Sequence, residues 1–143
     1  MNTPPCATFV DTGSLVFLSG QTASDNLGIV RGDTEAQTFR CLESMENRLS
    51  DAGLSRAQLV ECTIWLCHQA DISAFNAAYA AYFGPHEPAH SVVIGRLGVT
   101  GALVEIEAIA RREMQACIRS TPLLHQRPAS GTTSGLNKGR ALE

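Results

Sequence analysis

Residues 103–110 alternate so regularly between two kinds of side chain that they constrain the fold of the whole chain. One face of the predicted strand is entirely apolar and consists of Val104, Ile106, Ala108 and Ala110. The opposite face consists of Leu103, Glu105, Glu107 and Ile109. Two carboxylates beside Leu and Ile are unusual for a face that simply meets water, and His90 begins the preceding predicted strand. The pattern predicts a half-buried strand and marks its second face as a candidate site.

The length and charge of the chain limit its architecture and its partners. A chain of 143 residues is long enough for one domain with a core, but not for two. The formal net charge of −3 argues against strong electrostatic binding to nucleic acid or to an anionic membrane. The five cysteines form no CxxC pair and the apolar runs are shorter than a membrane span, so we expect free thiols and a cytoplasmic location.

The sequence lacks the motifs of the common cofactor and metal sites. It contains no P-loop, no GxGxxG after a predicted strand and no GxSxG elbow. His86 and His90 are four residues apart, but Pro88 lies between them, so they lack the helical geometry of an HxxxH zinc site. We therefore expect no cofactor and no metal.

The spacing of the apolar residues predicts two helices and six strands. The first helix begins at a capping box formed by Thr34 and Gln37 and ends at Gly53, and the second runs from Asp71 to Gly84. Strands are predicted at 8–10, 15–19, 28–30 and 59–67, followed by two strands between 88 and 110. This order predicts an α+β domain in which two helices lie on one face of a six-stranded mixed sheet.

The second face of the predicted sheet is too apolar to be left open. In strand 59–67, one predicted face is Val60, Cys62, Ile64 and Leu66, and the other is Leu59, Glu61, Thr63, Trp65 and Cys67. Two helices cover only one face, so the face with Trp65 needs a partner, and we expect a homo-oligomer. The domain is expected to span 1–118, and the segment 119–143, rich in Gly, Ser and Thr, is expected to be a flexible tail.

Five segments of the chain, in the same order, resemble the YjgF/Rid family, whose namesake is a deaminase of 2-iminopropanoate and 2-aminoacrylate and which is also described as endoribonuclease L-PSP. They are LVFLSGQ at 15–21, GDTEAQT at 32–38, FNAAY at 75–79, PAHS at 88–91 and VEIEAI at 104–109. The resemblance covers roughly Pro5 to Arg112. It implies a chorismate-mutase-like fold and a homotrimer in which the sheets surround a central barrel, with the helices outside and three clefts between subunits.

The resemblance also implies a set of site residues. Glu105 matches a family glutamate that positions the hydrolytic water, and His90 stands where active deaminases have an arginine that holds the substrate carboxylate. Both are candidate catalytic residues. The candidate ligand-binding residues are Cys6 and Leu18, which replace a tyrosine and a threonine, together with Ser19, Gly20, Asn76 and Val92.

Several alternatives stay open at this point. His90 either lines a ligand cleft as a proton donor or acceptor, or is a hydrogen-bonded interface histidine. Glu105 either acts as a general base or is paired structurally, for example with Arg96. If Cys6 and His90 lie together in the cleft, they would form a Cys–His pair in which Cys6 is a thiolate nucleophile. The expected function is accordingly hydrolysis of 2-imino or enamine acids to 2-oxo acids and ammonia, or non-catalytic binding of a small carboxylate by a regulatory trimer. The net charge argues against an activity on RNA.

Overall fold

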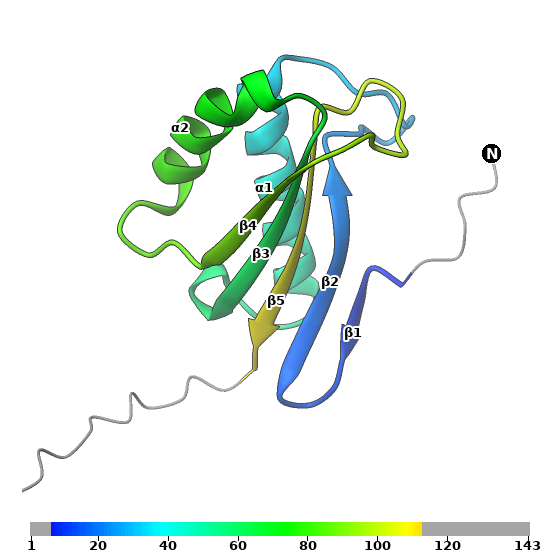
Figure 1. The fold of residues 1–143 in the computed structure, drawn as a ribbon. Helices are drawn as coiled ribbons and strands as arrows, with labels where there is room; N and C mark the ends of the chain where they lie inside the picture. The colour runs from blue at the N-terminus through cyan, green and yellow to red at the C-terminus, as the bar shows by residue number, and fades with distance from the viewer. Residues whose placement is uncertain (1–6, 113–143) are drawn as a thin grey trace, which may run out of the picture.

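The computed structural model describes residues 7–112, which form two layers: a mixed sheet and two helices that cover one of its faces (Figure 1). The strands are β1 (Phe9–Asp11), β2 (Leu15–Thr22), β3 (Leu59–Leu66), β4 (Ala89–Ile94) and β5 (Val104–Arg111). The helices are α1 (Thr34–Asp51) and α2 (Ile72–Phe83), with 3₁₀ turns η1 (Arg56–Gln58) and η2 (Gln69–Asp71). The predicted α+β class, with both helices on one face, is confirmed.

The strand count differs from the prediction. Within residues 7–112 the sheet has five strands and not six. The segment predicted as a strand at 28–30 contributes only an isolated bridge between Ser24 and Val30. It lies in a turn whose backbone is bound by Asp25, because the Asp25 carboxylate accepts the N–H groups of Leu27 and Ile29 at 2.9 Å each. The predicted tail at 119–143 and the candidate residue Cys6 lie outside the described residues.

Strand β5 is the centre of the sheet. The strand order is β1-β2-β5-β3-β4, so β5 pairs antiparallel with β2 on one side and with β3 on the other. Strand β4 pairs in parallel with β3 at the opposite edge from β1, and α2 makes the connection between them (Figure 1). The carboxylates of β5 therefore lie in the middle of the sheet, and His90 lies at its edge.

The first helix begins one residue earlier than a Thr34 cap would place it. Its cap is Asp33, whose carboxylate accepts the Ala36 N–H at 2.9 Å, and Thr34 is the first helical residue. The predicted capping box is wrong because the Gln37 amide is used elsewhere: it donates to Gly101 O at 3.1 Å and accepts from Leu103 N at 2.8 Å. Within residues 7–112, neither helix has the length and apolar character that crossing a membrane requires.

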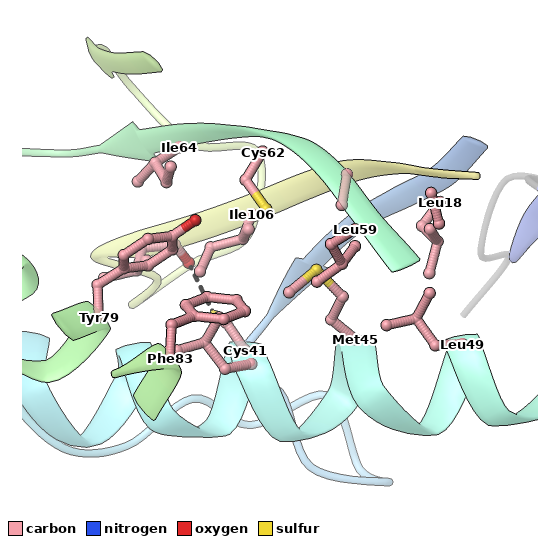
Figure 2. Close-up of a cluster of buried hydrophobic side chains, with 14 of the residues drawn as sticks. Leu18, Cys41, Met45, Leu49, Leu59, Cys62, Ile64, Tyr79, Phe83 and Ile106 are labelled. Atoms are coloured by element: carbon pink, nitrogen blue, oxygen red, sulfur yellow. Dashed lines mark hydrogen bonds between the residues drawn. The ribbon is translucent and has the colours of Figure 1, made fainter. Parts of the chain in front are cut away.

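The core lies between the helices and the sheet (Figure 2). The predicted apolar face of β5 is confirmed, because all four of its residues are buried: Val104, Ile106, Ala108 and Ala110. In β3 the prediction is reversed at one end, since Leu59 is 8% exposed and belongs to the core, while Val60 is 37% exposed. The cause is a β-bulge: Leu59 pairs with Ala110 and Glu61 with Ile109, which leaves Val60 as an extra residue and shifts the alternation.

Candidate functional site

The face of the sheet turned away from the helices, called here the open sheet face, combines carboxylates with apolar side chains. In the register of the sheet, Glu105 pairs with Trp65, and Trp65 pairs with Val93 of β4. One pair further along, Glu107 lies opposite Thr63. Three large apolar side chains are exposed on this face: Val10 (54%), Phe17 (42%) and Val93 (36%). The uncovered second face that the sequence predicted is therefore present.

A hollow of about 350 Å³ lies on the open sheet face. Its lining comes from β1, β2, β3 and β5 and consists of Val10, Phe17, Leu18, Ser19, Glu61, Thr63, Glu107, Ala108 and Ile109. Two carboxylates thus share the hollow, and one of them, Glu61, accepts a hydrogen bond from the Thr63 hydroxyl at 3.3 Å. Glu105 is not part of this lining. It lies further along β5, where β2 departs from regular pairing.

A β-bulge in β2 brings the backbone of Gly20 against Glu105. Leu18 pairs with Ala108 and Gln21 with Ile106, so Ser19 and Gly20 together face Glu107, the only residue between those partners on β5. A Cβ atom placed on Gly20 would lie 2.1 Å from Glu105 Oε1 and 3.0 Å from its Cδ. Only glycine leaves room for the carboxylate in this position.

The surroundings of Glu105 make its carboxylate more basic than an exposed one. Partial burial raises the pKa of Glu105 above the ordinary value of 4.5, and the neighbouring charge of Glu107 raises it further. On the helix side, burial and then the charge of Glu105 raise the pKa of the Cys41 thiol to about 12. The Glu105 carboxylate is therefore more basic than an exposed one, whereas Cys41 stays a protonated thiol.

Ser19 and Leu18 play different parts from one another, although both were predicted to bind ligand. Ser19 lies in the bulge, and its hydroxyl donates to Ala7 O at 2.5 Å, which ties the segment before β1 to the site. Leu18 borders the hollow, but its side chain is only 4% exposed and points toward Leu49 of α1 (Figure 2). The Leu18 side chain is thus a core group, because the bulge that changes the alternation begins after it.

His90 lies on the other side of the sheet from Glu105. It pairs with the buried Cys62, and its ring centroid lies 4.9 Å from that of Tyr79, which belongs to the core beneath the helices. Val92 is partly buried and packs against the same core, and Asn76 is exposed on α2. Burial raises the pKa of Tyr79, so its hydroxyl stays protonated beside the imidazole.

Apart from Leu18, which belongs to the core, the predicted site residues that the structure describes form two groups. Ser19, Gly20 and Glu105 make up the first, which we call the bulge group. The second group consists of His90 and Val92 of the edge strand β4 and Asn76, which is exposed on α2; we call it the edge group. Within one protomer the sheet separates the two groups. The expectation that His90 shares the uncovered face with the carboxylates is therefore wrong within one protomer, because the register pairs His90 with the buried Cys62.

Two polar residues were not among the predicted site residues: Gln21, which lies beside the bulge, and Glu61, which lines the hollow. The Gln21 side chain reaches back to the bulge and is held by Ser44 of α1. The signal was present in the segment LVFLSGQ, where Gln21 follows Gly20, but alternation alone does not show which face it occupies. Glu61 was assigned to the correct face without a role. No group of three or more His, Cys, Asp or Glu side chains within residues 7–112 is arranged to hold a metal ion.

The fold and the open sheet face define a class: a small two-layer α+β domain whose sheet presents a basic carboxylate on an uncovered apolar surface. Residues 4–112 match the family described as Endoribonuclease L-PSP. The chain therefore belongs to that family, which is the YjgF/Rid family.

Known relatives cover most of the described region. Protein DfrA of Myxococcus xanthus is 38% identical over 71% of this chain and 79% of its own length. The 3-aminoacrylate deaminase RutC of Acinetobacter baylyi is 37% identical over 75% of this chain and 89% of its own. Among solved structures, E. coli TdcF with bound serine superposes with a TM-score of 0.72 at 32% identity, covering 78% of this chain and 91% of TdcF. These relatives agree with the family and the fold expected from the sequence.

Proposed function

We propose that the protein hydrolyses 2-imino acids, or their enamine tautomers, to 2-oxo acids and ammonia in clefts between copies of the chain. The observation on which this proposal rests is Glu105, a partly buried carboxylate with a raised pKa on an uncovered sheet face. Its support from relatives is the RutC protein, whose name states deamination of 3-aminoacrylate. The imino acid and water are the only reactants that the reaction needs.

The reaction proceeds in two steps, each with a defined proton transfer. Glu105 removes a proton from water while the oxygen attacks the imine carbon, the C–O bond forms, and the electron pair of the C=N bond passes to nitrogen, which takes up a proton. In the second step the hydroxyl proton is transferred to the amino nitrogen, the C=O bond forms and the C–N bond breaks, so that ammonia departs. A carboxylate with a raised pKa suits both steps, because its proton affinity lies closer to the working pH.

The division of the site residues into two groups favours a cleft between subunits. The bulge group lies on the open sheet face and the edge group on β4 and α2, with His90 on the helix side, so a site that uses both needs a second copy of the chain. Exposed Phe17 and Val93 give that copy apolar surface to cover. In this arrangement Glu105 of one subunit activates the water, and His90 and Asn76 of its neighbour contact the substrate carboxylate.

The experiment generates 2-imino acids in solution with an amino-acid oxidase and follows their decay with and without the protein. Glu105→Gln removes the base and is expected to abolish the acceleration, whereas the control Glu43→Gln, which changes an exposed glutamate of α1, retains it. His90→Arg is expected to raise activity on the order of 10–100-fold, because a guanidinium offers a bidentate, charged contact to a carboxylate. Equal acceleration by the wild type and Glu105→Gln would refute the proposal.

Non-catalytic ligand binding is the second candidate function, and the position of His90 favours it. The imidazole of His90, whose ring is tilted by 53° against that of Tyr79, lacks the fork with which an arginine binds a carboxylate, which weakens substrate binding. Serine, which is bound in the TdcF structure, is the first ligand to test. Calorimetric binding of serine or a 2-oxo acid, combined with no acceleration of imine decay in any variant, would favour this second function.

A further inference from the structure

The β2 bulge has its own support, which comes from the side chain of Gln21. Gln21 pairs with the buried Ile106, so it faces the helix layer rather than the open sheet face. Its Nε2 donates to Ser19 O at 2.8 Å and to Gly20 O at 3.3 Å. The two carbonyls that Gln21 binds thus belong to the two residues that the bulge contains.

A second contact fixes the orientation of this amide. The Ser44 hydroxyl, on α1, donates to Gln21 Oε1 at 2.7 Å. With its oxygen bound by Ser44, the amide presents its NH₂ group to the bulge. Gln21 therefore connects α1 to the bulge through both ends of one side chain, and all of these contacts lie within one protomer.

We propose that Gln21 is a positioning residue that holds the Ser19–Gly20 bulge against the carboxylate of Glu105. The bulge lacks regular pairing with β5, so its place depends on other contacts. Gly20 lies so close to Glu105 that a shift of the bulge must change the space and the hydration around that carboxylate. The catalytic part of this inference rests on the proposed function, but the structural part does not.

The titratable groups coupled to Glu105 make this proposal measurable. They are Glu107 from β5 and Cys41 from α1. Gln21 is uncharged, so Gln21→Met keeps the length of the side chain, removes both donated hydrogen bonds and changes no charge. A change in the titration of Glu105 in this variant therefore reports a change in its position or hydration.

The test follows the Glu105 carboxyl carbon by NMR during a pH titration of the full-length protein, with Glu105→Gln used to assign the signal. In Gln21→Met the bulge loosens, water reaches the carboxylate, and the titration midpoint falls toward that of an exposed glutamate. The rate of imine hydrolysis at saturating substrate falls on the order of tenfold, with a smaller change in KM. Ser44→Ala, which removes only the orienting contact, moves the midpoint in the same direction by less.

The matched control is Gln58→Met. Gln58 also donates from Nε2 to backbone carbonyls, those of Arg111 at 3.4 Å and Arg112 at 3.2 Å, but at the far end of β5. This variant is expected to lose stability and to leave the Glu105 midpoint unchanged. An unchanged midpoint in folded Gln21→Met and in Ser44→Ala overturns the inference. A midpoint that moves in a protein without imine hydrolysis supports the positioning role and refutes the proposed reaction.

Discussion

Substituting Gly20 by alanine tests the site at its tightest contact. The new Cβ would lie 2.1 Å from Glu105 Oε1, and an ordinary contact begins at 3.4 Å, so the oxygen must retreat by about 1.3 Å. The Glu105 Cδ and Cγ, at 3.0 Å and 3.1 Å from the new atom, must yield by a few tenths of an ångström. The strain falls mainly on the flexible end of a side chain, so the carboxylate moves while the fold remains.

The expected effects on stability and on activity differ in size. Glycine destabilises a strand by roughly 0.5–1 kcal/mol relative to alanine, so the gain in Gly20→Ala offsets much of the strain. We expect a free energy of unfolding within about 1 kcal/mol of the wild type, measured by urea denaturation. A displacement of about 1 Å costs a catalytic group on the order of 100-fold in rate, so imine hydrolysis should fall by about that factor.

Gly98→Ala is the matched control, because a Cβ at Gly98 meets no atom within 4 Å and its backbone conformation suits other residues. It should leave both stability and activity unchanged. Unchanged activity in Gly20→Ala would show that the position of Glu105 does not matter for the reaction. A loss of several kcal/mol of stability would show that the carboxylate cannot move, and would refute the reasoning from flexibility.

Three further predictions follow from burial and charge. Because the pKa of Glu105 is raised in the folded protein, ionisation of this carboxyl lowers the free energy of unfolding once the pH exceeds the ordinary value of 4.5. Glu105→Gln should therefore be more stable than the wild type at about pH 7 and lose this advantage at about pH 4. A difference that stays constant in denaturant titrations at both pH values would contradict this. Phe17→Asp should shift sedimentation toward the monomer, because it places a charge on the open sheet face, and an unchanged sedimentation coefficient would argue against an interface there. Leu18→Ala should lower the free energy of unfolding by about 2–5 kcal/mol, and a loss of ligand binding at unchanged stability would show that Leu18 is not a core residue.

The sequence was sufficient where apolar residues alternate without interruption. In β5 the alternation predicted both faces, and it placed Glu105 and Glu107 correctly on the uncovered one. The β3 bulge was not predictable, because Leu59 and Val60 are both apolar and exchanging them leaves the pattern unchanged. The β2 bulge was not predicted for a related reason. After Leu18 the residues of the strand are polar or glycine, so no apolar pattern shows where the alternation between the two faces changes.

The orientation of His90 depended on tertiary pairing. The residues after it, Ser91, Val92, Val93 and Ile94, include apolar side chains at both alternate positions, so the strand has no preferred face of its own. Only the register that pairs His90 with Cys62 assigns it to the helix side. The resemblance to a family predicted residues of both groups as parts of one site, but their positions on opposite sides of the sheet depend on the pairing of the strands.

The central place of β5 has a consequence for how the protein comes to be folded. Strand β5 is synthesised after both helices and the other four strands, yet it is the strand that pairs with both β2 and β3 and joins them in one sheet. A nascent chain that has emerged as far as Leu103 therefore holds two separate sheet fragments, β1-β2 and β3-β4, and each has an open edge where β5 will pair. Such intermediates are prone to aggregation, so chaperone demand during synthesis should peak just before residues 104–111 emerge and fall once they dock.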